Sequence, residues 1–519
     1  MESEGGSTGR GWGKLLNSVN LADVFVGLAT RWPDRRAIIS PRITLSYSQL
    51  VARAAQSARE LRSRGIVAGA KVGIGIRDGA ETIVLMIATW MLGATAVPVD
   101  FRTNAAERGL LAREFDLLAI LEDRQLPAAG CDSILIDASW ADRIAIQDRD
   151  PIWTSGERPA AAALISLTSG TTGRPIGIVL DHERTLLRAV AEFSPRFGAT
   201  LLNPLPLSFS GSRSHTLSAL LHGSAVSFHP VLFSAQELVE AILAGKVTSV
   251  CAVPTIVRKL LELSSERSSP AFEGLDALYC FGALMLPEEK RQATALCNNF
   301  IGKYSSSLSG PISLLCGADL EAHGDTVGRV LPHVALQIVD DDDEVLPLGE
   351  AGTIRVRSPG MARAIYGGST RASGDKLKGG WAYPGDIGAV DGDGFLRLLA
   401  RTSDLIIRGG VNVHPSEVEV VIAEHEGVRE VAVVGFAKLP EGEEIAAIVV
   451  PSSDLTEAAL VAHCRARLSP DKRPRKFVFV TELPRNANGK ISRAKLRQQL
   501  ETRADAEAEA GRNSSQPRS

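Results

Sequence analysis

A loop rich in glycine and hydroxyl residues, at residues 168–177, is the feature that most restricts how this chain can fold. An apolar run at residues 163–167 leads into it, and the loop holds four hydroxyl side chains and three glycines. Glycines let backbone N–H groups approach an anion closely, and hydroxyls add donors without bulk. No Gly-Lys-Ser/Thr sequence closes the loop, so it is not of the Walker A type. By composition alone, an ordinary surface loop fits equally well.

The chain around this loop alternates short apolar runs with helical patterns. Strands are expected at residues 71–76, 94–99, 119–122 and 133–136, and helices at residues 80–91 and 105–114. Such alternation is typical of an α/β domain with mostly parallel sheets.

The pattern changes after about residue 327, and 519 residues are too many for one hydrophobic core. Antiparallel strands are expected at residues 336–339, 352–357 and 394–398, followed by an α+β region with helices at 416–425, 455–468 and 492–502 and strands at 428–435, 445–450 and 476–480. The predicted organisation is a disordered tail at 1–18, a large α/β domain with a β-rich subdomain at 19–403, a small mobile α+β domain at 404–501, and a disordered tail at 502–519.

Composition excludes several classes of protein. The formal net charge of −3 gives no general attraction to nucleic acid or to an anionic membrane. No uninterrupted apolar run reaches the length of a membrane span, and residues 1–14 lack the apolar core of a secretory signal. The six cysteines are scattered without a CxxC pair. We therefore expect a cytoplasmic protein without a disulfide framework or a zinc site.

The order of residues in the loop is more informative than its composition. Thr-Ser-Gly-Thr-Thr-Gly-x-Pro-x-Gly closely resembles the signature of the adenylate-forming superfamily, which includes acyl-CoA synthetases, luciferases and peptide-synthetase adenylation domains. Further segments follow in the family's order, from about residue 21 to residue 500: residues 205–209 (LPLSF), 282–283 (GA), 349–352 (GEAG), 381–386 (WAYPGD), 401–404 (RTSD), 409–413 (GGVNV) and 488–491 (NGKI). The resemblance is greatest to AMP-forming acyl-CoA ligases.

This resemblance implies that an organic acid, aryl or aliphatic, is activated with ATP to acyl-AMP and then joined to coenzyme A. Lys490 is the implied catalytic residue, because its ammonium would bridge the acid and the α-phosphate. The implied ATP- and AMP-binding residues are Thr168, Ser169, Gly170, Thr171, Thr172, Gly173, Gly282, Ala283, Tyr304, Ser307, Asp386 and Arg401. Asp404 is the implied hinge, and Phe209, Ser210, Ser212 and Phe281 are the implied acyl-pocket residues.

Two departures from the family pattern concern the phosphate site. The loop usually carries Lys after its Pro, and this chain has Ile176, with Arg174 as a possible substitute. The family's Tyr-Gly-x-Thr-Glu segment reads here from Tyr304 to Leu308, so Ser307 replaces Thr and Leu308 replaces Glu. That Glu normally helps to hold Mg²⁺, which needs oxygen ligands, so the magnesium site is expected to be atypical.

The sequence restricts the identity of the acid substrate and of the acyl acceptor less than it restricts the family. Peptide-synthetase domains place Asp where this chain has Ser210, so an α-amino acid is disfavoured. His215 could meet a substrate hydroxyl, although a packed helix histidine is the favoured interpretation. The basic run at residues 471–475 could bind the nucleotide of coenzyme A or be a solvated loop. A free-standing carrier protein, another nucleophile as in nitrite-dependent diazotisation, and a non-catalytic nucleotide-binding homologue remain alternatives.

Overall fold

The computed structural model describes residues 19–126, 130–152, 162–169, 175–192, 197–231, 233–244, 246–265, 270–366, 376–408, 411–439, 442–452, 454–485 and 491–502. They belong to two compact units. Residues 337–354 and the chain from residue 385 onward form the second unit, and the remainder forms the first.

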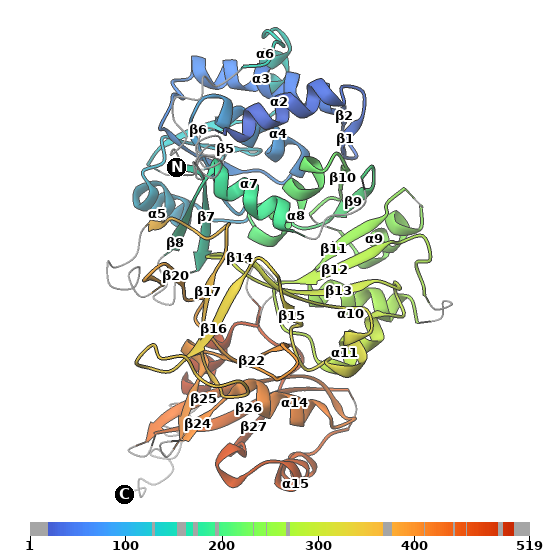
Figure 1. The fold of residues 1–519 in the computed structure, drawn as a ribbon, viewed down its shortest axis with the longest axis vertical. Helices are drawn as coiled ribbons and strands as arrows, with labels where there is room; N and C mark the ends of the chain where they lie inside the picture. Colours follow the sequence, from blue (N-terminus) through green and yellow to red (C-terminus); the bar gives the residue numbers. More distant parts are fainter. Residues whose placement is uncertain are drawn as a thin grey trace, which may run out of the picture. The chain divides into compact units, whose positions relative to one another are not determined.

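Two mostly parallel sheets build the first unit (Figure 1). In spatial order the first sheet contains β15 (Arg329–Val330), β14 (Gly310–Cys316), β13 (Phe300–Ser306), β12 (Ala277–Phe281), β11 (Ser249–Ala252), β9 (Thr200–Asn203), β10 (Ala225–Phe228), β1 (Arg36–Ile39) and β2 (Thr44–Ser46). The second contains β18 (Ala364–Tyr366), β8 (Pro175–Asp181), β7 (Ala162–Ser169), β4 (Thr95–Pro98), β3 (Lys71–Gly75), β5 (Ala119–Glu122) and β6 (Asp132–Leu135).

Helices cover these sheets, and many of them begin at a residue whose side chain caps the first turn. They are α2 (Leu21–Arg31), α3 (Tyr47–Ser63), α4 (Gly79–Met91), α5 (Ala105–Phe115), α6 (Ala138–Ala145), α7 (His182–Ala191), α8 (Ser210–Leu221), α9 (Ala235–Leu243), α10 (Pro254–Leu263), α11 (Pro287–Ala293) and α12 (Asp319–Ala322). The Asp181 carboxylate accepts from the backbone N–H of Arg184 and so starts α7. α7 packs against α8, and the candidate site is built around this pair (Figure 1).

The second unit contains an antiparallel part and an α+β part. Its strands include β21 (Asp386–Val390), β22 (Leu396–Arg401), β23 (Ile406–Arg408), β24 (Val411–Val413), β25 (Val428–Leu439), β26 (Gly442–Pro451) and β27 (Lys476–Phe479), and its helices include α14 (Pro415–Ala423), α15 (Glu457–Arg467) and residues 493–502, with short 3₁₀ turns at Thr402–Asp404 and Pro470–Lys472. β25 and β26 pair over most of their length, and α14 and α15 bury their apolar residues against them.

Four strands lie where the chain passes between the two units or returns to the first. β16 (Ala335–Val339) and β17 (Gly352–Arg357) each begin in one unit and end in the other, and the short strands β19 (Leu377–Lys378) and β20 (Trp381–Ala382) belong to the first. Gly352 pairs with Gly388 of β21 in the second unit, whereas Val356 pairs with Ala382 of β20 in the first.

The structure confirms the predicted mixed α/β class and nearly every expected element. The strand expected at residues 394–398 was placed too early: β22 runs over Leu396–Arg401. Gly394 has a φ of 83°, and its N–H donates to the Asp391 carbonyl, so it completes a turn before the strand. The predicted domain boundary at Asp404 lies inside the second unit, and where the chain hinges stays a prediction. The tail predicted at 1–18 lies outside the described residues, and so does the tail predicted at 502–519 except for Thr502, which ends the last helix.

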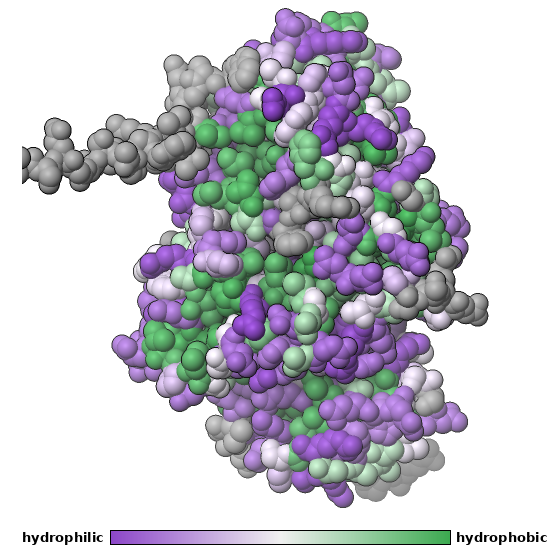
Figure 2. Space-filling model, turned by 45° about the vertical axis from the view of Figure 1, so that its right-hand side comes forward, coloured by the Kyte–Doolittle hydropathy of each residue, from purple (hydrophilic) through white to green (hydrophobic). Residues whose placement is uncertain are grey.

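Within the described ranges, no helix combines the length and the apolar character that a bilayer crossing requires. Polar and apolar residues are interspersed on the face drawn in Figure 2.

Candidate active site

The predicted phosphate loop connects two strands of one hairpin. β7 and β8 pair antiparallel, with Thr168 opposite Ile176, and the Thr168 hydroxyl donates to the Ile176 carbonyl at 3.4 Å. The Ile176 side chain is buried in the hydrophobic core, so an apolar residue suits this position. Gly170, Thr171, Thr172, Gly173, Arg174 and the Ser169 side chain lie outside the described residues, and their roles stay predictions.

Two aromatic rings and a glycine form the predicted acyl region. Phe209 immediately precedes α8, and its ring centroid lies 5.9 Å from that of Phe281 at the end of β12. Gly282 follows with a φ of 97°, and a Cβ atom there would stand 2.9 Å from Phe209 Cζ. A Cβ on Gly211 would likewise stand 2.6 Å from Phe281 Cε2. The two rings therefore pack closely because two neighbouring residues lack side chains, and Ala283 next to them is exposed.

Replacing Gly282 with alanine is expected to weaken acid binding and to destabilise the first unit by about 1–3 kcal/mol, because it adds strain at a positive φ and displaces the Phe209 ring. Urea unfolding and the KM for the acid measure the two effects. Gly274→Ala is the matched control, since a Cβ there would meet nothing within 4 Å. Equal behaviour of the two variants would contradict the prediction.

The two predicted pocket serines differ in their surroundings. Ser210 is half-buried at the first position of α8. Ser212 is fully buried, and its hydroxyl accepts from Asn203 Nδ2 at 2.9 Å and donates to the Leu205 carbonyl at 3.0 Å. The Ser212 hydroxyl therefore makes its hydrogen bonds inside the protein, and its part in an acyl pocket stays a prediction.

The segment from Tyr304 to Leu308 leaves β13 and turns toward β14. Tyr304 is buried, Ser307 is half-buried, and the Leu308 side chain packs in the hydrophobic core at 5% exposure. The described residues contain no group of three His, Cys, Asp or Glu side chains arranged for a metal ion. These residues do not fit a dedicated Mg²⁺ site, because a leucine offers no oxygen ligand where the family has a carboxylate.

A buried arginine, which the sequence analysis did not predict as a site residue, binds the backbone of this turn. Arg188 of α7 is 3% exposed, and its Nε donates to the Gly360 carbonyl at 2.6 Å. Its two Nη atoms donate to the carbonyls of Ser307 and Leu308 at 2.8 and 2.7 Å. Burial and the neighbouring Arg213 lower the pKa of Arg188 to about 9, which leaves it cationic at neutral pH.

A second buried arginine, which the sequence analysis also did not predict, binds the backbone just before Phe209. Arg213 of α8 is 2% exposed, and its Nη1 donates to the Leu207 carbonyl at 2.7 Å and to the Ser208 carbonyl at 3.3 Å. Its Nη2 donates to the Ser166 hydroxyl on β7 at 2.7 Å. Burial lowers the pKa of Arg213 to about 10.

A buried ion pair lies next to the Phe281 ring. The Lys303 ammonium is 2.6 Å from Glu192 Oε2 and 3.0 Å from His215 Nε2, and all three side chains are at most 2% exposed. His215 also packs on the rings of Tyr279 and Phe281. Burial, with help from Lys303, holds the pKa of His215 well below its usual value, so the imidazole is neutral. His215 is the packed helix histidine that the sequence favoured.

The remaining predicted residues belong to the second unit. Asp386 is 5% exposed, and its Oδ1 lies 2.8 Å from Arg401 Nε, on neighbouring strands. Asp404 Oδ2 lies 3.6 Å from Arg493 Nη1, so the predicted hinge carboxylate contacts the last helix. Lys490 lies outside the described residues. The ribose, phosphate and hinge roles of these residues stay predictions.

The mixed α/β fold, together with the glycine- and hydroxyl-rich sequence between β7 and β8, fits the adenylate-forming class of enzymes. Residues 27–366 match the AMP-binding enzyme family, and residues 417–490 match the AMP-binding enzyme C-terminal domain. The chain belongs to this family.

Its relatives and structural neighbours support this assignment over nearly the whole length. The indoleacetate–CoA ligase of Aromatoleum aromaticum is 30% identical over 90% of this chain and 95% of that protein. The long-chain-fatty-acid–CoA ligase FadD13 of Mycobacterium tuberculosis is 30% identical over 91% and 96%. The structure of o-succinylbenzoate coenzyme A synthetase from Bacillus subtilis with ATP and magnesium ion is 26% identical, with a TM-score of 0.82 over 92% of this chain and 99% of that one.

Proposed function

We propose that this protein is a cytoplasmic AMP-forming acid–CoA ligase. In the first half-reaction a carboxylate oxygen attacks the α-phosphorus of ATP, giving acyl-AMP and pyrophosphate. In the second, the thiol of coenzyme A attacks the acyl carbon, giving the thioester and AMP. The observation that carries this proposal is the match to acid–CoA ligases along nearly the full length of the chain.

The residues proposed for the first step supply positive charge and hold ATP in place. Lys490 would neutralise charge between the carboxylate and the α-phosphate, where two anions must approach each other. Asp386 would accept hydrogen bonds from the ribose hydroxyls, and Arg401, already paired with it, would hold that carboxylate or reach a phosphate. The phosphate loop would bind phosphate oxygens through its N–H and hydroxyl groups. Because the described residues offer no carboxylate cage, Mg²⁺ would enter with the oxygens of ATP.

The proposed acid is a compact aryl or aliphatic carboxylic acid. Phe209 is partly exposed and packs on the fully buried Phe281, so the Phe209 ring offers apolar surface to a ring or a short chain. Ser210 offers no carboxylate to an α-ammonium group, which disfavours amino acids. Indoleacetate, the acid named for the Aromatoleum relative, is an acid of the aryl type.

The acceptor is proposed to be coenzyme A, with a free-standing carrier protein as the second possibility. The basic run at residues 471–475 gives little support to a nucleotide site. Lys472 pairs with Glu417 at 2.5 Å, and Arg475 pairs with Glu444 at 3.1 Å. These contacts favour the interpretation of the run as a solvated, internally paired loop.

Pyrophosphate release, measured with a panel of aryl and aliphatic acids with and without coenzyme A, tests the proposal. We expect release with at least one compact acid and a stoichiometric loss of free thiol when coenzyme A is present. Release without thiol loss would assign a carrier protein or another nucleophile, including an amine. ATP binding without release for any acid would instead identify a nucleotide-binding homologue and refute the ligase assignment.

A further inference from the structure

The buried layer between α7, α8 and β13 carries more positive than negative charge. Among the described residues, its cations are Arg188, Arg213 and Lys303, and its carboxylate is Glu192. Glu192 is ion-paired with Lys303 and also acts on the Arg188 charge, so one carboxylate serves two of the three cations, and neutral His215 adds no charge. Within the described parts of the chain, the guanidinium groups of Arg188 and Arg213 donate hydrogen bonds to carbonyl and hydroxyl oxygens and form no ion pair.

Such an excess of buried charge is unfavourable in the protein alone. Buried charges are normally paired with an opposite charge, because hydrogen bonds to neutral groups recover only part of the lost hydration. In the protein interior the electric field of an unpaired charge is also weakly screened. A layer of this kind therefore favours an anionic ligand at its surface.

The groups that the two arginines bind show where that surface lies. Arg213 bonds to Ser166 on the strand that enters the phosphate loop, and to the backbone just before Phe209. Arg188 bonds to the backbone of Ser307 and Leu308. These are the segments assigned to ATP and to the acid, and they are the segments in which Ile176 and Leu308 replace the usual lysine and metal-binding carboxylate.

We propose that Arg188 and Arg213 are positioning residues for adenylation, which fix the loops around the phosphate site and supply positive potential for the triphosphate of ATP. In doing so they supply part of the positive charge that the missing lysine, and a metal ion held by the missing carboxylate, would bring to this site. The proposal rests on the proposed function, since it assigns the triphosphate to that same site.

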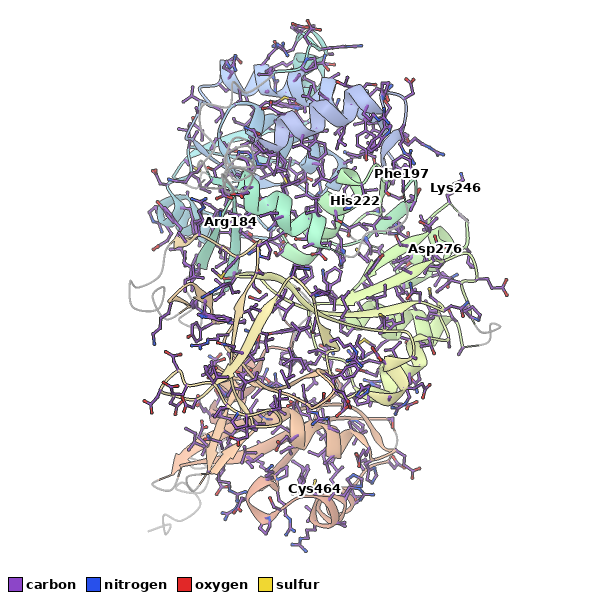
Figure 3. The ribbon with its side chains drawn as sticks, viewed as in Figure 1. Arg184, Phe197, His222, Lys246, Asp276 and Cys464 are labelled. Atoms are coloured by element: carbon purple, nitrogen blue, oxygen red, sulfur yellow. The ribbon has the colours of Figure 1, made fainter. Side chains whose placement is uncertain are left out.

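The comparison of ATP with uncharged adenosine separates this electrostatic role from a structural one. By titration calorimetry without any acid, Arg188→Met is expected to weaken ATP binding roughly tenfold or more, the effect of one weakly screened charge, and adenosine binding by less than about threefold. Arg184→Met is the matched control on the same helix (Arg184 is labelled in Figure 3), because Arg184 is ion-paired with Asp181 at 2.9 Å. It should leave both affinities within about twofold of the wild type.

Conservative variants complete the test. Arg188→Lys and Arg213→Lys keep the charge and lose part of the hydrogen bonding, so the ratio of ATP to adenosine affinity should stay within about threefold of the wild-type ratio. They also serve if Arg188→Met does not fold. Equal losses for ATP and adenosine, or a collapse of the ratio in the lysine variants, would overturn the proposal. Since no acid is needed, failure of the ligase assignment is recognised separately, by absent pyrophosphate release from a protein that binds ATP.

Discussion

Replacing Lys490 with alanine is expected to lower the rate of acyl-adenylate formation by roughly 10²–10³-fold, the scale found when one preorganised transition-state donor is removed. Two anions approach each other in this step, and the ammonium is the group proposed to stabilise the charge that develops between them. The measurement is pyrophosphate release at saturating ATP with an acid that the wild-type enzyme uses.

The same variant offers an internal control, because in the proposed mechanism that ammonium acts only in the first half-reaction. With chemically prepared acyl-AMP and coenzyme A, Lys490→Ala should form thioester within about threefold of the wild-type rate. Lys495→Ala is the matched surface control, since Lys495 lies on the exposed side of the helix at residues 493–502. An adenylation rate unchanged in Lys490→Ala would remove the role proposed for this residue.

Local patterns were sufficient to predict most of the fold. β3, α4, α5 and β5 coincide with the expected elements within a residue or two, because apolar runs and capping residues such as Asp78 act over short distances. The exception at residues 394–398 arose at a glycine whose positive φ makes a turn rather than a strand. How the chain divides into units depends on long-range contacts, and a motif such as residues 401–404 does not reveal them.

The candidate site was only partly visible in the sequence. The phosphate loop, Gly282 and Asp386 stand in contiguous motifs, whereas the buried charges come from separate elements. Lys303 and Glu192 are 111 residues apart, and Arg188 and Leu308 are 120 apart. Each of these charged residues alone is more often a solvated surface residue. The sequence held only a weak sign that these charged residues are buried. Arg213 is followed in its helix by the uncharged Thr216, Leu217 and Leu220, and Lys303 lies within an apolar strand.

The buried pair of Glu192 and Lys303 gives the largest expected effect on stability. Glu192→Leu would leave the Lys303 ammonium without its carboxylate in a layer that already holds Arg188 and Arg213. We expect the first unit to lose about 3–5 kcal/mol, the usual effect of removing one partner from a buried ion pair. The urea midpoint of the unfolding transition that reports on this unit measures the loss, with Trp90, fully buried in its core, as the fluorescent reporter.

The double variant Glu192→Leu/Lys303→Met decides whether charge or packing is responsible. If the loss in the single variant comes from an unpaired ammonium, removing that ammonium should restore the midpoint to the wild-type value or above it, because apolar residues of similar volume often replace a buried pair without cost. Lys303 also lies 5.0 Å from the Phe281 ring, so its methionine replacement keeps contact with the aromatic region. A double variant as unstable as Glu192→Leu would contradict the electrostatic account and show that the shape of the Glu192 side chain is what the core requires.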